Sequence, residues 1–206
     1  MKYSALETLD DYFQKTEHAV RHYYAGLDSC WAYYREASTH WDVSKVNEPM
    51  TVERKEALDR YLKLADKYFD LKISEAMFAG SILQMAYIAI RFYSKNQEIS
   101  ETYRHLVKNK TGIQFCVGPE LYGIPAGLII YAARNQFAHW DDEQSHPATS
   151  VVFDALTIAI MDNMFADLAF SLSNPSIPVY AKEVLLTALR WDTYDKYLEG
   201  IRDILK

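Results

Sequence analysis

Apolar residues recur every seven positions through the first part of the chain. Two rows, apolar apart from Thr16, carry this repeat: Leu6, Phe13, Val20, Leu27 and Tyr34 in one, and Leu9, Thr16, Tyr23, Cys30 and Ala37 in the other. Rows with this spacing form the seam of a helix that packs lengthwise against a second helix. The pattern therefore predicts a single long helix over residues 3–39.

A second helical pattern begins after a break at 47–49, where the sequence reads Asn-Glu-Pro. Thr51 has the hydroxyl of an N-cap, and Glu53 places a negative charge where the helix dipole favours it. Arg54 stands where a capping box would have Glu or Gln. Apolar residues then follow at helical spacing: Leu58, Tyr61, Leu62, Ala65, Tyr68, Phe69, Met77, Leu83, Tyr87 and Ile90. This pattern predicts a helical segment antiparallel to the first helix.

The rest of the chain reads as shorter helices separated by loops. We expect a short polar helix over 100–108 and then a loop rich in Gly and Pro over 112–127. A helix over 125–140 follows, with Pro125 at its first position, and Ser145 and Pro147 open an apolar helix over 151–172. The chain continues with a turn over 174–178 and one or two amphipathic helices over 179–206. No strand is predicted.

These elements predict an all-α protein with a single domain, residues 1–206, built as an antiparallel up-and-down helical bundle. Its core is expected within about 51–172, with the N-terminal helix 3–39 and the C-terminal helices 179–206 packed against it. Gly and Pro number only 7 and 6, which excludes a collagen-like chain and a β-sandwich with many turns.

Charge and cysteine content narrow the function classes. With 22 basic and 28 acidic residues the net charge is −6, so any contact with nucleic acid must be confined to a local cleft. Cys30 and Cys116 fit neither a zinc spacing nor a disulfide framework and are expected to be free thiols. No signal peptide or membrane-length apolar run is predicted, and we expect a cytoplasmic protein without a cofactor or metal.

Candidate chemistry lies in the helix predicted over 125–140. There Arg134, Asn135 and His139 interrupt an apolar sequence directly after the Gly/Pro-rich loop. Arg is a permanently charged, forked ligand for phosphate, and His transfers protons near neutral pH. On a straight helix Asn135 and His139 lie ~40° apart, whereas Arg134 and His139 lie ~140° apart. Arg134 and His139 therefore converge only if the helix loosens at its end, or if a second copy supplies its own His139.

The sequence Arg134-Asn135, three further residues and His139 resembles the motif of the HEPN superfamily (higher eukaryotes and prokaryotes nucleotide-binding). The resemblance implies a helical bundle that dimerises and a metal-independent endoribonuclease of the toxin or phage-defence kind. It also implies an RNA substrate, leaves an antitoxin or regulatory partner open, and does not imply a nucleotidyltransferase antitoxin. Arg134 would hold the scissile phosphate, His139 would act as general acid or base, and Asn135 would orient the imidazole. Where one toxin subgroup has Tyr, this chain has Asp141, so regulation by tyrosine modification is not implied.

Two alternatives remain at the level of sequence. The same fold can act without catalysis, as a helical module for dimerisation or for binding a nucleotide or a protein, and the acidic net charge favours that function. His18 and His22 have a spacing compatible with a metal, but Val20 between them lies on the seam and no third ligand is identifiable. A structural role is expected for both histidines.

Overall fold

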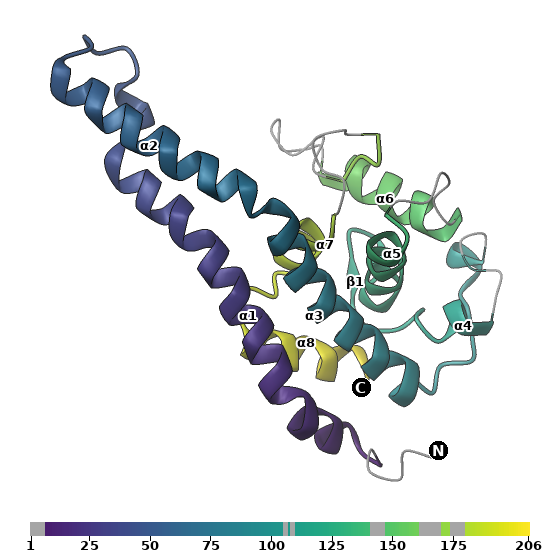
Figure 1. Ribbon diagram of the computed structural model, residues 1–206. Coiled ribbons are helices and arrows are strands. Elements are labelled where there is room, and N and C mark those ends of the chain that lie inside the picture. Colours follow the sequence, from purple (N-terminus) through teal and green to yellow (C-terminus); the bar gives the residue numbers. More distant parts are fainter. Residues whose placement is uncertain (1–6, 105–106, 108–109, 141–146, 161–169, 174–179) are drawn as a thin grey trace.

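The computed structural model describes residues 7–104, 107, 110–140, 147–160, 170–173 and 180–206, and it confirms the all-α class (Figure 1). Three helices dominate it: α1 (Leu9–His40), α2 (Val52–Asp70) and α3 (Lys72–Tyr93). Helix α1 lies along both α2 and α3, so the predicted long antiparallel pair is present. A single non-helical residue, Leu71, separates α2 from α3.

Local capping explains where the first two helices begin. Helix α1 begins at Leu9, later than the predicted position 3, because Thr8 and Asp11 form a complete capping box. Residues 1–6, including the seam position Leu6, lie outside the described residues. Helix α2 begins after Thr51, whose hydroxyl accepts the Arg54 backbone N–H as predicted. The Arg54 side chain donates to Glu48 at 2.7 Å and so ties down the loop that holds the 3-10 turn η1 (Val43–Lys45).

The heptad rows identify most of the buried face of α1. Phe13, Val20, Leu27, Cys30 and Ala37 are buried, most of them against α3 or the body of the fold. Tyr34, predicted on the same seam, is instead 46% exposed, although its ring centroid lies 5.4 Å from that of Tyr68 on α2. Helix α2 has no buried residue, and Leu62 and Phe69 are exposed. The arm formed by α2 and the end of α1 therefore projects from the body (Figure 1).

The middle of the chain departs from the prediction. Of the polar helix expected over 100–108, the described residues form the 3-10 turn η2 (Glu101–Tyr103), capped by Ser100, and 105, 106 and 108 lie outside them. The short helix α4 (Lys110–Ile113) comes next. The Gly/Pro-rich loop contains a two-residue antiparallel pairing that we did not predict, β1 (Glu120–Leu121) with β2 (Ile124–Pro125). Gly123 between them has φ 74°, a conformation that glycine adopts readily.

The second half builds the body around α5 (Ala126–Ala138), which packs between α3 and α6 (Pro147–Ile160). Pro125 is the N-cap of α5 rather than its first residue, and Pro147 opens α6 as predicted. The described residues do not include Ser145, residues 161–169 of the predicted apolar helix, or the turn predicted over 174–178. Leu172, the predicted last residue of that helix, is described and is not helical. The chain ends in α7 (Ala181–Glu183), the π-helical segment η3 (Val184–Ala188) and α8 (Tyr194–Ile204).

Helix α3 is the central helix of the fold. Of the described helices it is the one that length and composition alone would allow to cross a membrane, and half of its apolar window is buried within the protein. It contacts α1 on one side and α5 and α7 on others. A core helix with neighbours on several sides is expected to be this apolar.

Candidate functional site

The predicted motif lies at the C-terminal end of α5, where that helix lies very close to α3. Gly80 of α3 makes this approach feasible, since a Cβ at that position would come within 2.3 Å of the Phe137 ring. Most of α5 is buried, and the motif residues Arg134 and Asn135 are half-buried at its rim. The site is therefore built on two tightly packed helices rather than on a loop.

Two residues of α3 fix the Arg134 side chain. Its Nε donates to Oε1 of Gln84 at 2.8 Å, and its guanidinium lies over the Tyr87 ring, 4.9 Å from the centroid. Its Nη1 also donates to Oδ1 of Asn135 at 3.3 Å. The cation is thus held in one orientation at the protein surface, and the structure brings Arg134 and Asn135 together as the motif predicts.

His139 occupies the end of the helix. It is the C-cap of α5, with φ −132° and ψ 33°, and its backbone N–H donates to the carbonyl of Asn135 at 3.1 Å. The helix ends two residues before the predicted end at position 140, so His139 already has a non-helical backbone. Its side chain is exposed, as is the neighbouring Trp140, at 52%. The loosened end is one of the two conditions for Arg134 and His139 to act on one substrate.

The other candidates from the sequence lie elsewhere. His18 and His22 are exposed on α1, with ring centroids 6.3 Å apart. Among the described residues, no group of three His, Cys, Asp or Glu side chains is placed to hold a metal ion. Cys30 and Cys116 are free thiols, and burial raises the pKa of Cys116 to about 11, so this thiol is not activated as a nucleophile.

Sequence reasoning did not identify the residues of α3 that hold Arg134. Gln84 is an amide within a mostly apolar helix, a signal that was present in the sequence, but its partner lies fifty residues further along the chain. Tyr87 was assigned to the helical core pattern. It does stack on Phe115, with centroids 4.7 Å apart, while also supporting the Arg134 guanidinium.

A charged cluster with one buried carboxylate was not predicted either. Glu75 of α3 is 1% exposed and lies 3.3 Å from Nζ of Lys182, which is also 3.4 Å from Glu183. Burial raises the pKa of the Glu183 carboxyl. Burial also lowers the pKa of the Lys182 ammonium, but Glu183 and Glu75 more than offset this, and that pKa is raised. Two carboxylates therefore share one ammonium where α7 meets α3.

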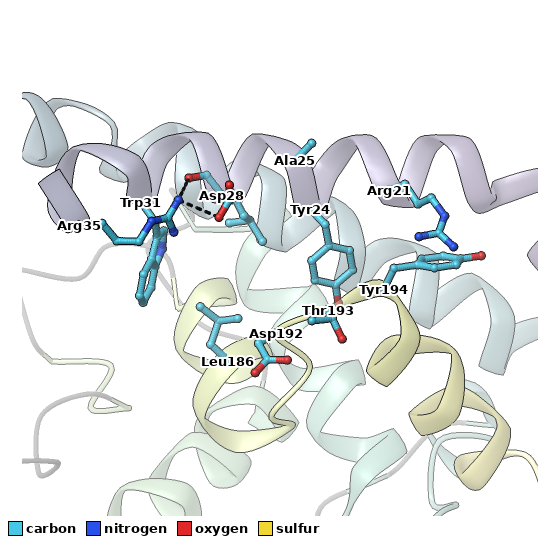
Figure 2. Close-up of a pocket in the computed structure, with 11 residues that line it drawn as sticks. Arg21, Tyr24, Ala25, Asp28, Trp31, Arg35, Leu186, Asp192, Thr193 and Tyr194 are labelled. Atoms are coloured by element: carbon cyan, nitrogen blue, oxygen red, sulfur yellow. Dashed lines mark hydrogen bonds and ion pairs between the residues drawn. The ribbon is translucent and has the colours of Figure 1, made fainter.

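A cleft of about 460 Å³ lies along α1, opposite η3 and the start of α8 (Figure 2). Most of its wall is apolar, with Tyr24, Leu27 and Trp31 from α1 and Leu186 from η3. None of its lining residues belongs to the predicted motif. The structure thus contains two separate candidate sites, one at the end of α5 and one along α1.

Comparison with known proteins finds no matching family model, no similar curated protein and no similar solved structure.

Proposed function

We propose that this protein is a metal-independent endoribonuclease of the HEPN type, acting at a site formed across a homodimer as a toxin or phage-defence effector. The observation that supports the proposal most is the Arg134 guanidinium, which Gln84 and Tyr87 hold in place next to Asn135. One turn later, at the end of the same helix, the His139 side chain is exposed. A fixed cation and an exposed imidazole at the same end of one helix suit phosphoryl transfer from RNA.

The proposed reaction uses the 2′-hydroxyl of the substrate as nucleophile. A neutral His139 imidazole accepts the proton of that hydroxyl while its oxygen attacks the phosphorus, and the bond from phosphorus to the 5′-oxygen breaks. The departing 5′-oxygen takes a proton from the protonated His139 of a second copy. Arg134 stabilises the charge that develops on the phosphate oxygens. The products carry a 2′,3′-cyclic phosphate and a free 5′-hydroxyl.

The surface around the end of α5 supports the homodimer in this proposal. Trp140 follows the motif and is 52% exposed, and Met77 of α3 is exposed as well. Met77 precedes Gly80, the contact point of Phe137, by about one helical turn, so its side chain lies toward the same end of α5. Exposed apolar side chains next to polar site residues are a feature of protein interfaces.

The test measures cleavage of a mixed RNA pool in the presence of EDTA. We expect wild type to cleave, and His139→Ala and Arg134→Ala each to reduce the rate by a factor of about 10² or more. Arg134→Lys keeps the charge but loses the forked geometry, so it should restore only part of the rate. His18→Ala, an exposed histidine on α1, is the matched control and should cleave like wild type.

Two outcomes would reject the catalytic assignment. The first is that both motif variants cleave as well as wild type, and the second is that cleavage requires added Mg²⁺. Arg134, Asn135 and His139 offer no carboxylate to hold such an ion.

A non-catalytic helical module is the second candidate. It is favoured by the net charge of −6 and by the contacts of Arg134 with Gln84 and Tyr87, which also serve to join α5 to α3. In that case Arg134→Ala would lower the free energy of unfolding, while RNA would remain uncleaved by wild type. Thermal unfolding of Arg134→Ala, measured beside the cleavage assay, distinguishes the two functions.

A further inference from the structure

Helix α2 packs against α1 along one side and leaves its opposite side open (Figure 1). On the packed side the Lys67 ammonium lies 5.6 Å from the centroid of the Tyr33 ring. The Tyr68 ring lies 5.4 Å from that of Tyr34, again centroid to centroid. A helix usually buries its apolar stripe against a neighbour, yet none of the 19 residues of α2 is buried. The side turned away from α1 is therefore a surface to search for a partner.

An apolar row runs along this open side and continues into α3. Its members are Leu62, Phe69 and Ile73, which are 52%, 61% and 55% exposed. At 100° per residue the three lie within ~40° of one another, on the side turned away from Tyr68 and Lys67. The αR backbone of the junction between α2 and α3 lets the row continue from one helix into the next. Exposed apolar residues in a polar surround are a feature of protein interfaces.

An aspartate row accompanies the apolar row. Asp59, Asp66 and Asp70 each precede a member of the apolar row by three positions, so both rows have spacings of seven and four and lie ~60° apart. All three aspartates are exposed, and none forms an ion pair with another described residue. The carboxylates of Glu48 and Glu56 on the same arm do have arginine partners, at 2.7 and 3.6 Å. The aspartate row thus keeps its charge available.

Two lysines border this surface. Lys72 lies on the flank of the apolar row away from the aspartates, with its ammonium 5.5 Å from the centroid of the Phe69 ring. Lys63 lies beyond the aspartates, ~40° further round the helix, and forms no ion pair with a described residue. Even with Lys63 included, the flank that holds the aspartate row carries more negative than positive charge. The surface is therefore apolar along its centre and acidic along one edge.

This charge pattern selects among the possible occupants. Nucleic acid and anionic membrane surfaces are repelled by unpaired carboxylates. Two arms packed antiparallel would bring their aspartate rows together, and two arms packed parallel would offer each row only Lys72 as a partner. A helix with an apolar row and a basic edge matches both rows, as in coiled coils, where charges beside the apolar seam select the partner.

We propose that this face of the arm docks a basic amphipathic helix of a partner protein. The apolar residues of that helix pack on the apolar row, and its Lys or Arg side chains pair with the aspartate row. The two rows span residues 59–73, or ~21 Å, which a helix of about 15 residues covers. The face contains no residue of the proposed ribonuclease site, so the two proposals stand or fall independently.

The experiment measures binding of a labelled helical peptide to the full chain by fluorescence anisotropy. The peptide has about 18 residues, with Leu at intervals of three and four, Lys on both edges of the Leu row and Ala elsewhere. A second peptide has Glu in place of every Lys. We expect the Lys peptide to bind with a Kd of about 10 μM or below, and at least about tenfold more tightly than the Glu peptide.

A matched pair of phenylalanine variants tests the apolar row. Phe69→Gln should weaken binding of the Lys peptide at least about tenfold, because Phe69 is the largest member of the row. Phe92→Gln changes a phenylalanine that is 60% exposed at the other end of α3, and it should bind the peptide like wild type. Both side chains are exposed to the same extent, so both variants are expected to fold.

A matched pair of double variants tests the aspartate row. Asp66→Asn combined with Asp70→Asn should weaken binding of the Lys peptide at least about fivefold. Glu199→Gln combined with Asp203→Asn removes the same charge from exposed positions on α8 and should leave binding unchanged. Hydrogen exchange then locates the peptide, because saturation should slow exchange over 52–70 at least about fivefold without slowing it over 194–204.

Several results would overturn the proposal. The first is that the Lys peptide does not bind at about 1 mM, or that the Glu peptide binds equally well. The second is that Phe69→Gln and the variant of Asp66 and Asp70 both bind like wild type. The third is that Phe69→Gln changes the sedimentation of the free protein, which would assign the face to a second copy. The fourth is that Phe69→Gln abolishes binding to phosphatidylcholine vesicles, which would assign it to a membrane.

Discussion

Arg134 shows how a charged side chain is positioned before any substrate arrives. A free arginine loses rotamer freedom when it binds a phosphate, whereas Arg134 is already held by the Gln84 amide, the Asn135 amide and the Tyr87 ring. Among the described residues these three partners are uncharged, so they orient the guanidinium without neutralising it.

Arg190 has an unfavourable backbone conformation, and a single substitution can relieve the strain. Its φ of 58° brings Cβ close to the carbonyl oxygen that follows, and glycine has no such contact. We expect Arg190→Gly to raise the free energy of unfolding by about 0.5–1 kcal/mol. Urea denaturation measures the change. Arg190→Ala removes the same side chain but keeps Cβ, so it should give no gain. An equal gain in both variants would assign the effect to the charge instead.

The two carboxylates that share Lys182 give the free energy of unfolding a pH dependence. Burial raises the pKa of Glu183 in the folded state above its unfolded value. The contribution of Glu183 to the free energy of unfolding is therefore fully present below the unfolded pKa and is lost as pH rises through the folded pKa. Glu183→Gln has no carboxyl group to ionise, so the variant avoids this loss of stability, and Lys182 stays paired with Glu75. The variant should therefore be more stable than wild type at pH 7, with the difference vanishing near about pH 4.

Urea denaturation at both pH values measures this effect. Glu56→Gln, on the exposed surface of α2, is the control and should show no comparable trend. If Glu183→Gln is instead less stable than wild type at pH 7, the attraction between Glu183 and Lys182 outweighs the cost of burial.

At the scale of elements, the sequence predicted well those helices and helix starts that are determined by residues close to one another in the chain. The seven-residue rows identified α1, and Thr51 and Pro147 marked the starts of α2 and α6, because caps and repeats depend on nearby residues. The predicted end of α5 was two residues too late, and the helix predicted over 100–108 contains the 3-10 turn η2. At these positions the packing of segments distant in sequence determines where an element ends. The close approach of Gly80 to Phe137 is one example of such packing.

The candidate site was predictable only in part for the same reason. The motif residues Arg134, Asn135 and His139 are close in sequence, so their spacing was visible. The partners Gln84 and Tyr87 lie on another helix, and the cleft along α1 joins residues from both ends of the chain. No repeat or spacing in a single sequence reports such contacts.

Helix α2 is expected to be the least stable of the long helices. It has no buried residue, and most of its contacts are with α1 alone, whereas α3 has nine buried residues and contacts several helices. Local unfolding is cheapest where few apolar contacts are lost. Hydrogen exchange should therefore proceed at least about tenfold faster in peptides from 52–70 than in peptides from 76–90. Equal protection in the two helices would show that something covers α2 in solution.

For the molecule as a whole, the proposed ribonuclease uses a second copy, because two chains can bring Arg134 of one against His139 of the other, whereas on a straight helix the two residues would diverge by ~140°. We expect sedimentation equilibrium at micromolar concentration to show a homodimer with His139 near the two-fold axis. Trp140→Glu and Met77→Glu place a charge among the exposed apolar residues at the end of α5 and should give monomers. Val52→Glu changes an exposed apolar residue at the far end of α2 and should remain dimeric.

The same variants connect assembly to activity. Both monomeric variants retain Arg134, Asn135 and His139, so a loss of RNA cleavage in them would show that catalysis uses groups from two chains. Wild type that sediments as a monomer would remove the composite site. A monomer that nevertheless cleaves RNA would require Arg134 and His139 of one chain to reach the same phosphate, which the non-helical backbone at His139 then has to provide.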